Sequence, residues 1–365
     1  MRTICILLPA HWDYMKGGAE YQADCFAEYL KEKKDYDVVY LARDISTSAN
    51  THNYEIIKIP TLFKSHRYGL FWDGISLYKK LAEINPDVIL QHIGCAYTGI
   101  ASFYCKKHMK GMIWHIASDI DVEKRKIPFS LKKIPRILDN FMMQYGIKQS
   151  KSIIAQTSRQ ADLLKSNYNR DAEYVIPNFH PIHEGDLCKN SNLTVLWVAN
   201  IKKLKQPELF VRLANECEMH EDIKFKLIGR NENTPWCDSI LSDIAKSKNI
   251  EYLGEMTNDQ VNKEIEAAHI LVNTSVYEGF PNTFIQAWMR EVPTLSLNVD
   301  PDGVIQKHNI GLHAKNIENM RGFIVTMRNS NDLHEMGRRA RKIAEENYSM
   351  KNADRIIDII ESYMK

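Results

Sequence analysis

The feature that most constrains the fold is an alternation of two kinds of segment along all 365 residues. Short apolar segments with the length of buried strands are separated by longer segments whose apolar residues recur at helical spacing. Segment 19–31 shows this spacing on one helical face, at Ala23, Phe26, Ala27 and Leu30. Repeated strand–helix alternation predicts an α/β fold of parallel sheets with helices on both faces.

The expected strands form two series. The first series is 3–9, 37–41, 54–59, 87–92, 111–116, 152–156 and 174–176. The second series is 194–199, 224–229, 250–253, 270–274 and 293–297. The polar segment 179–192, which lacks periodicity and contains proline and glycine, is the expected boundary between them. One twisted sheet rarely holds so many strands, so we predict two doubly wound, Rossmann-like domains facing each other across a cleft. Two helices, 333–346 and 352–364, are expected to end the chain.

The charge balance and the cysteines exclude several classes of protein. The 48 Lys and Arg against 46 Asp and Glu give a net charge of +2, which provides no bulk attraction to nucleic acid. No apolar run approaches the roughly 18 residues of a membrane span. Residues 1–9 are interpreted as a buried strand rather than a signal peptide.

The seven cysteines are dispersed without a CxxC pair, which argues against a disulfide framework and a zinc site. A cytoplasmic protein with reduced thiols and no metal site is expected.

The strongest local motif is the sequence EGFPNTF at 278–284, which follows an expected buried strand and opens an expected helix. Gly279 permits close backbone approach, and Pro281 is preset for a helix start. The amide groups from Asn282 and Thr283 onward would then point out of the helix N-terminus. Such an end attracts a phosphate or a carboxylate.

Two polar side chains accompany this motif. Gln286 lies about one helical turn inside the helix and can reach the same ligand from the side. Glu278 precedes the turn. The alternative interpretation is a capped strand–turn–helix whose Glu278 faces solvent, and motif matches alone do not exclude it.

The motif, with a second polar residue eight positions after its glutamate, resembles the donor-binding motif of the GT-B retaining glycosyltransferases, the glycosyl transferases group 1 enzymes. The resemblance covers essentially the whole chain, through GGAE at 17–20, NPDVI at 85–89, WH at 114–115, VIPN at 175–178, VAN at 198–200, KLIG at 226–229, DPDGVI at 300–305 and NIGL at 309–312. It implies an acceptor domain at 1–186, a donor domain at 193–347 and a crossover helix at 348–365 that returns to the first domain.

The resemblance implies transfer of a sugar, with retention, from a UDP- or GDP-linked donor to a glycan or lipid-linked acceptor. No cofactor and no catalytic metal are implied. The expected setting is synthesis of a cell-surface polysaccharide or glycolipid, in the cytoplasm or on the cytoplasmic membrane face. The alternatives are a non-catalytic sugar-nucleotide-binding protein, or another GT-B enzyme such as a phosphorylase or an epimerase. A Rossmann dehydrogenase is disfavoured because no GxGxxG follows a strand.

The resemblance also assigns roles in the donor domain. Lys205 matches the lysine that meets the charge of the leaving diphosphate. Asn200 stands where the family has an arginine, which removes a fixed charge, and Lys202 is a candidate substitute. Glu278 corresponds to the glutamate facing the donor sugar, so Lys205 and Glu278 are expected to be catalytic. The rest of the motif, expected to bind the donor, is Gly279, Phe280, Pro281, Asn282, Thr283 and Gln286.

Gln286 replaces a family glutamate that accepts hydrogen bonds from both ribose hydroxyls. A carboxamide can accept from one hydroxyl and donate to the other. The binding energy should therefore change by about 1 kcal/mol or less, and Gln286→Glu is predicted to keep or improve donor affinity.

In the acceptor domain, the resemblance places His115 beside the donor sugar as a third catalytic residue. The alternative is a histidine satisfied within the core. Asp119 is a weaker candidate for contact with the acceptor. Backbone amides at two glycine-containing turns complete the expected donor site, at Gly17, Gly18, Gly303 and Val304. For the first of these turns, a flexible turn before a helix is an equally good interpretation.

Segment 123–151 interleaves basic and apolar residues. One interpretation is a surface that rests on anionic lipid, where lipid-linked acceptors would be found. The other, which we favour, is a helix with an apolar core face and a solvated basic face.

Overall fold

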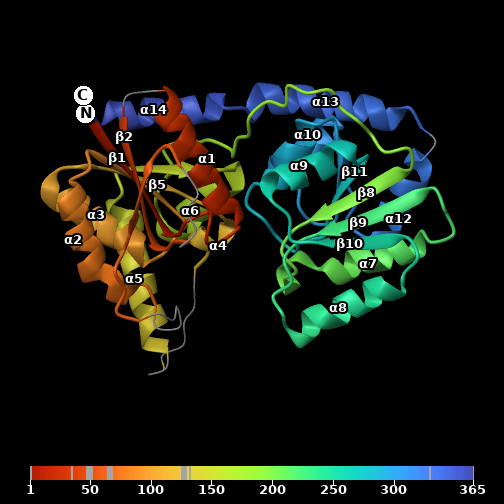
Figure 1. Ribbon diagram of the computed structural model, residues 1–365. Helices are drawn as coiled ribbons and strands as arrows, with labels where there is room; N and C mark the ends of the chain where they lie inside the picture. Colours follow the sequence, from red (N-terminus) through yellow and green to blue (C-terminus); the bar gives the residue numbers. More distant parts are fainter. Residues whose placement is uncertain are drawn as a thin grey trace. The chain divides into compact units, whose positions relative to one another are not determined.

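The computed structural model describes residues 2–33, 36–46, 52–63, 69–124, 130, 133–328 and 330–364. The chain divides into two compact units (Figure 1). The N-terminal unit comprises Met1–Phe179 and Lys351–Lys365, and the C-terminal unit comprises His180–Met350. From the sequence, the corresponding limits were expected at 186, 193 and 348.

The N-terminal unit is built on one parallel sheet in the order β3-β2-β1-β4-β5-β6-β7. Its strands are β1 (Arg2–Ala10), β2 (Tyr36–Asp44), β3 (Glu55–Lys58), β4 (Val88–His92), β5 (Gly111–His115), β6 (Ser152–Ala155) and β7 (Tyr174–Val175). Its helices are α1 (Gly18–Lys33), α2 (Gly74–Ile84), α3 (Ala96–His108), α4 (Asp119–Val122), α5 (Ile134–Gln149), α6 (Ser158–Tyr168) and α14 (Lys351–Ser362), with a short 3-10 turn η2 (Phe71–Asp73). All seven strands overlap the segments predicted from the apolar runs, and β1 and β2 extend beyond them.

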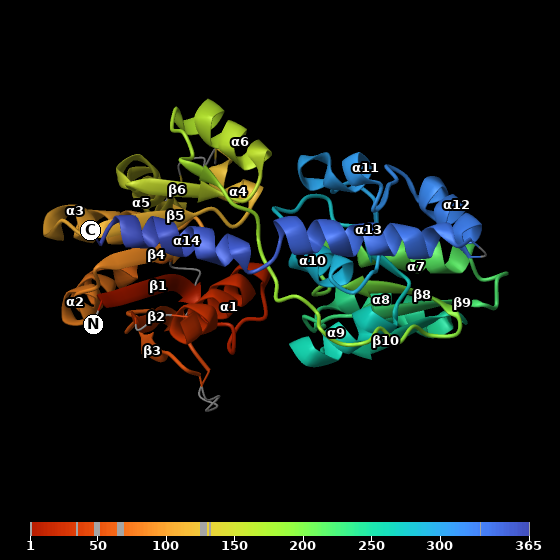
Figure 2. The same cartoon turned by 90° about the horizontal axis from the view of Figure 1, so that it is seen from above.

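Helices cover both faces of this sheet, as the alternating pattern predicts. On β1, Cys5 and Leu7 join a cluster with Leu77 of α2 and Tyr97 of α3. The predicted apolar face of α1 is buried in the structure. The last helix, α14, lies beside α1 (Figure 2), where the Tyr29 hydroxyl donates to Asp354 at 2.8 Å. The chain therefore returns to its first unit at its end, as the expected crossover helix requires.

The C-terminal unit has a second parallel sheet in the order β10-β9-β8-β11-β12-β13. Its strands are β8 (Leu193–Val198), β9 (Ile223–Ile228), β10 (Ile250–Gly254), β11 (Ile270–Asn273), β12 (Thr294–Ser296) and β13 (Gly311–His313). Its helices are α7 (Pro207–Glu216), α8 (Pro235–Lys246), α9 (Asn258–Ala267), α10 (Asn282–Trp288), α11 (Val304–His308), α12 (Ile317–Met327) and α13 (Asp332–Asn347), with 3-10 turns η4 (Lys203–Lys205) and η5 (Pro301–Gly303).

Strand β13 was not among the expected strands, although it begins within the NIGL segment 309–312. Residues Gly311–His313 pair with β12 in parallel register. Three residues are too few to show a period, and none of the three is fully buried. The strand therefore left no hydrophobic pattern to read.

Successive residues of β8 point to opposite faces of the second sheet, because side chains alternate along a strand. Val195 and Trp197 pack into a core with Phe210 of α7. Leu196, between them, packs into a second core with Trp288 of α10. Figure 1 shows α7 and α8 on one side of these strands and α9 and α10 on the other. Burying each such apolar side chain contributes about 1.5–3 kcal/mol.

Both sheets reverse the direction of strand addition at one point. In the first sheet, β1 lies between β2 and β4; in the second, β8 lies between β9 and β11. The connections that leave β1 and β4 therefore diverge, as do those that leave β8 and β11. Ligands of open α/β sheets bind in the crevice at the carboxyl ends of such a strand pair.

The predicted basic segment 123–151 is described only in part, since 125–129, 131 and 132 lie outside the described residues. Its described helix, α5, buries Met143, Gly146 and Ile147 and exposes Phe141. Among the residues that the structure describes, no helix combines the length and the apolar character needed to cross a membrane.

Candidate active site

In the C-terminal unit, the connections after β8 and β11 are bonded to each other at the point where the sheet reverses. The Thr274 hydroxyl donates to the carbonyl of Lys205 at 2.6 Å. The Val276 amide donates to the carbonyl of Leu204 at 2.9 Å. The indole Nε1 of Trp197 donates to the Thr274 oxygen at 2.9 Å. These bonds fix the short turn η4 against the segment that precedes α10.

This docking brings Lys205 and Glu278 together. The Lys205 ammonium donates to Glu278 Oε1, and the two side chains are 22% and 17% exposed. The Ser275 hydroxyl donates to the same carboxylate oxygen at 2.7 Å. The Ser275 amide in turn donates to Asn273 Oδ1 at 3.0 Å. A cation with three N–H donors and an acceptor carboxylate are thus held at one edge of the sheet.

Three of these supporting residues were missed by the sequence analysis, namely Trp197, Thr274 and Ser275. One signal was present: Thr274 and Ser275 are polar residues that directly follow a buried strand, and polar residues in such a position are candidates for a site at the sheet edge. The pairing of Trp197 with Thr274 depends on two strands that are distant in sequence, so the sequence held no signal for it.

The predicted helix start within the EGFPNTF motif is present, with Pro281 at the N-cap and Asn282 as the first residue of α10. The helix has only 7 residues. The ring of Phe280 is buried and packs against Tyr348, with ring centroids 4.8 Å apart. The side chain of Phe280 therefore belongs to the core, so the predicted contact with a donor would have to use its backbone.

Gln286 is buried one turn into α10 and contacts helix α9. Its Nε2 donates to Asn258 Oδ1 at 3.0 Å and to Asn262 Oδ1 at 3.2 Å. The sequence analysis did not single out either asparagine. The three amides form one hydrogen-bonded group between the two helices.

The connections after β8 and β9 approach each other closely. A Cβ on Gly229 would lie 1.7 Å from the carbonyl oxygen of Ala199, so only glycine fits there. This contact positions the backbone before Asn200, which is partly exposed. Lys202 follows, but its Nζ lies 3.4 Å from Glu232 Oε1. The structure thus gives Lys202 an ion-pair partner different from that of Lys205.

The amides of Gly303 and Val304 have partners within their own loop. The Gly303 amide donates to the carbonyl of Asp300 at 3.1 Å, and the Val304 amide donates to that of Pro301. Gly303 has a φ of 70°, in the left-handed region, and is the N-cap of α11. A bound donor would have to compete with these internal bonds for the two amides.

In the N-terminal unit, His115 ends β5 beside His92, which ends β4 in the same register. The ring centroids are 4.4 Å apart, and the His92 Nδ1–H donates to the carbonyl of His115 at 3.0 Å. Burial lowers the pKa of His92 to about 4 and holds the pKa of His115 well below its ordinary value. Both imidazoles are therefore neutral near pH 7. The sequence analysis missed His92, although both histidines end buried strands.

The two histidines line a small cavity with Gln22 of α1 and Phe179. Its volume of about 10 Å³ is close to the minimum that holds one water molecule. His115 is 4% exposed, so the structure combines both interpretations offered above: the ring is buried and lies at the carboxyl edge of the sheet.

The remaining candidates have local structural partners. Asp119 begins α4 and accepts from Arg159 Nε at 2.9 Å. The Gly17 amide donates to the carbonyl of Met15 at 3.0 Å, and Gly18 is the first residue of α1. These positions fit the predicted turn before a helix, and their contact with a substrate stays a prediction.

Two protein-family models match the chain. The model described as Glycosyltransferase Family 4 matches residues 16–183, and the model described as Glycosyl transferases group 1 matches residues 192–335. The first match lies almost entirely in the N-terminal unit, and the second lies within the C-terminal unit.

Solved glycosyltransferase structures share the fold over their whole length. Sucrose-phosphate synthase from Thermosynechococcus elongatus is 13% identical with a TM-score of 0.77, covering 100% of this chain and 99% of that one. Anabaena Alr3699/HepE, solved in complex with UDP and glucose, is 13% identical with a TM-score of 0.73, covering 99% and 100%. WaaG, a glycosyltransferase involved in lipopolysaccharide biosynthesis, is 12% identical with a TM-score of 0.74, covering 98% and 99%. At these identities the likeness establishes the fold.

Proposed function

The chain belongs to the glycosyl transferases group 1 family, and from that premise we propose that it is a retaining glycosyltransferase. The proposed donor is a nucleotide diphosphate sugar, and the proposed acceptor is a glycan or a lipid-linked saccharide. The observation that carries this proposal is the Lys205–Glu278 pair at the point where the second sheet reverses. That edge is where open α/β sheets bind nucleotides.

The pair supplies the two groups that departure of a nucleoside diphosphate requires. Negative charge develops on the leaving diphosphate, and a fixed cation that meets it lowers the barrier. We assign this role to Lys205, whose carbonyl accepts from Thr274 and whose neighbour Leu204 accepts from the Val276 amide. Glu278, oriented by Ser275, would accept a hydrogen bond from a hydroxyl of the donor sugar. In the complex, the ammonium would turn from the carboxylate toward the diphosphate.

The uncharged side chains of His115 and Gln286 would position the donor. A neutral His115 can hydrogen-bond a sugar hydroxyl without repelling the positive charge that develops at the anomeric carbon. Gln286 is proposed to contact the ribose. We propose a UDP-sugar as the donor to test first, since Alr3699/HepE was solved with UDP-glucose.

The first experiment is a thermal-shift panel of UDP- and GDP-linked sugars. A ligand that binds only the folded state raises the melting temperature, so the preferred donor should produce the largest shift. Nucleotide release should then require an acceptor, and NMR of the product should show the anomeric configuration of the donor. Binding without release across lipid-linked and glycan acceptors would instead indicate the non-catalytic alternative.

The second experiment replaces the charged pair. Lys205→Met is expected to reduce turnover about 10²- to 10³-fold, the range measured when one transition-state donor is removed. Lys226→Met is the matched control, because Lys226 pairs with Glu264 at 2.7 Å and is 23% exposed, in the same unit. If both variants lost activity equally, or if Lys205→Met and Glu278→Gln kept full turnover, the assignment of the site would be wrong.

A further inference from the structure

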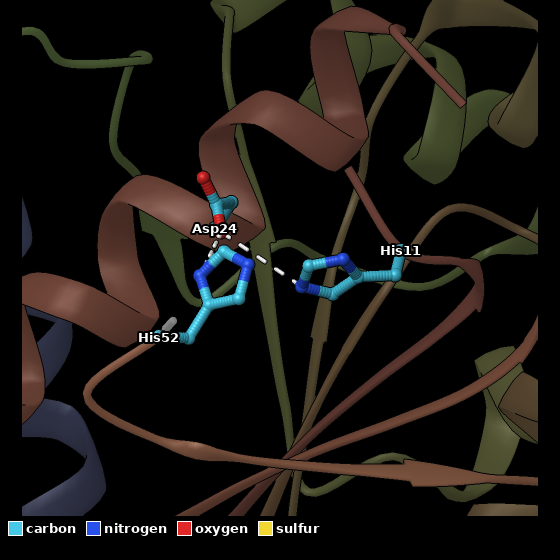
Figure 3. A group of neighbouring side chains, drawn as sticks. All are labelled: His11, Asp24 and His52. Atoms are coloured by element: carbon cyan, nitrogen blue, oxygen red, sulfur yellow. Dashed lines mark ion pairs between the residues drawn. The ribbon is translucent and has the colours of Figure 1, made fainter. Parts of the chain in front are cut away.

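Three side chains from separate elements of the N-terminal unit converge outside the groups discussed so far. His11 directly follows β1, Asp24 lies on α1, and His52 precedes β3. Figure 3 shows the imidazoles of His11 and His52 next to each other, with the Asp24 carboxylate facing both rings. Asp24 Oδ1 lies 3.8 Å from His11 Nε2 and 3.7 Å from His52 Nδ1.

Two imidazole nitrogens and one carboxylate oxygen are a ligand set that suits zinc. The three donor atoms all lie within 4.8 Å of one another. Ligands of a tetrahedral zinc ion at about 2.0–2.1 Å stand about 3.3 Å apart. Inward movements of several tenths of an ångström, up to about 1 Å, would therefore bring the three atoms to bonding distance. Side-chain rotations of Asp24 and His52, which are only partly buried, can supply them.

Asp13 and Tyr54 surround the two histidines in the way that hydrogen-bonding residues surround the ligands of a metal. Asp13 Oδ2 lies 2.7 Å from His52 Nε2 and 3.7 Å from His11 Nδ1, so one carboxylate faces the remote nitrogen of both rings. Carboxylates in this position fix the orientation of ligating histidines. The Tyr54 hydroxyl donates to Asp24 Oδ1 and lies 2.8 Å from His11 Nε2. A metal on His11 Nε2 would replace the bond between that nitrogen and Tyr54, while the hydroxyl could go on donating to the Asp24 carboxylate.

The proton on His11 would move within the ring. His11 Nδ1 accepts from the Asp13 amide at 3.1 Å, so in the metal-free cluster the proton lies on Nε2. Coordination through Nε2 transfers this proton to Nδ1. There the Asp13 carboxylate, rather than the Asp13 amide, becomes its partner.

The local charge also favours a dication. Asp13, Asp24 and Glu28 carry three negative charges around the two imidazoles, and Lys16 Nζ lies 3.8 Å from Asp13 Oδ1. The group therefore has a net charge of about −2 before any proton or metal binds. Glu28 Oε1 lies 3.1 Å from His52 Nδ1. In the absence of metal, a proton on Nδ1 would link these two residues.

From this geometry we propose that His11, Asp24 and His52 form a zinc site, with water as the fourth ligand. The site ties the end of β1 to α1 and to the segment before β3, so its role is structural. Sequence spacing could not show it, because the ligands come from three elements and include no cysteine. The proposal is independent of glycosyl transfer, and its test does not use activity.

The test measures zinc content and stability. Chain stripped with EDTA, incubated with an excess of ZnCl₂ and then gel-filtered should retain about one zinc per chain by mass spectrometry. Its melting temperature should rise by several degrees with added zinc. Asp24→Asn, which keeps the shape of the side chain and its bond to Tyr54, should weaken zinc binding at least tenfold. His52→Gln should do the same.

The control is His108→Gln, which removes an exposed histidine of α3 whose Nε2 lies 2.9 Å from the Tyr78 hydroxyl. This variant should retain zinc like the parent chain. Circular dichroism of each metal-free variant establishes that it is folded. Failure of the parent chain to retain zinc would overturn the proposal. So would equal retention by the parent chain and by folded Asp24→Asn and His52→Gln.

Discussion

At the scale of single residues, Gln286 provides a direct test of the proposed donor site. Its amide donates to Asn258 and Asn262, which can each rotate by half a turn to present Nδ2 instead of Oδ1. In Gln286→Glu, the carboxylate would then accept from both asparagines and still face a ribose hydroxyl. We expect donor affinity to be unchanged or up to about fivefold tighter, since the energies involved are about 1 kcal/mol.

Isothermal titration with the donor found by thermal shift would measure this affinity. Gln260→Glu adds the same charge on the neighbouring helix α9, at an exposed position in the Thr257 capping box, and should leave affinity unchanged. A loss of tenfold or more in Gln286→Glu alone would mean that Gln286 does not face the ribose.

The site residues differ in how far the sequence could predict them. Lys205 and Glu278 could be predicted from the sequence, because they belong to motifs whose order along the chain matches the family. Ser275 and Thr274 act through hydrogen bonds that form only when the ends of β8 and β11 meet. The His11, Asp24 and His52 group is more remote still, since its members are adjacent only through the packing of α1 on the sheet. A site assembled from side chains of several elements leaves no local pattern in the sequence.

At the scale of elements, helices α3 and α5 pack through glycines. A Cβ on Gly146 would lie 2.5 Å from the carbonyl carbon of Thr98, and one on Gly99 would lie 2.0 Å from the carbonyl oxygen of Met142. Both close contacts are with backbone, which cannot move without separating the helices. Gly146→Ala is therefore expected to reduce the free energy of unfolding by about 2–3 kcal/mol, as overpacking does.

A thermal or urea melt would measure this loss. Gly322→Ala is the matched control, since Gly322 lies inside α12 and a Cβ there would contact nothing within 4 Å. That variant should gain about 0.5–1 kcal/mol, because alanine loses less conformational entropy in a helix. Equal stability of both variants would show that α3 and α5 can separate without cost.

Elements with a long buried pattern were predicted, and so were the short strands β7 and β12, whereas β13 was not. The apolar faces of α1 and of β8 carry enough repeats to fix both type and orientation. Strand β13 has three residues and is recognisable only by its pairing with β12. In α5, the basic and apolar residues allowed two interpretations, a surface that rests on anionic lipid or a helix with an apolar core face. The burial of Met143 and Ile147 shows that part of the apolar pattern serves the core.

At the scale of the whole molecule, the N-terminal unit is discontinuous in sequence. Helix α14 buries Ile356 and Ile360, and its Arg355 donates to the carbonyl of Val175 at 3.1 Å. Tyr36 on β2 donates to Glu361 at 2.7 Å. The first unit therefore acquires its last helix only after the whole second unit has been synthesised, which couples the two units through the chain itself.

Buried neutral histidines in both units make the stability of the whole molecule sensitive to acid. Burial lowers the pKa of His92 in the first unit, and of His180 and His269 in the second, to about 4 in each case. In the unfolded chain these groups titrate near 6.5. Between about pH 6.5 and pH 4 the unfolded state thus binds more protons than the folded state. Stability is therefore fully present above pH 6.5 and is lost as the pH falls through this window.

His269 allows the contribution of one such group to be isolated. The Thr194 amide donates to its Nδ1 at 3.1 Å, so a proton on Nδ1 breaks a bond between β8 and the start of β11. His269→Asn offers Oδ1 as an acceptor and does not titrate.

Urea unfolding of His269→Asn at several pH values should show that the free energy of unfolding changes with pH less steeply than in the parent chain, by about 1 kcal/mol per pH unit between pH 6.5 and 4. This lies below the limit of about 1.4 for a single proton, because the two states differ by less than one bound proton across this window. His334→Asn, on the exposed face of α13, should leave the slope unchanged. If His269→Asn kept the slope of the parent chain, the loss of stability in acid would have to come from other groups, and Nδ1 of His269 would not be the acceptor that the structure assigns.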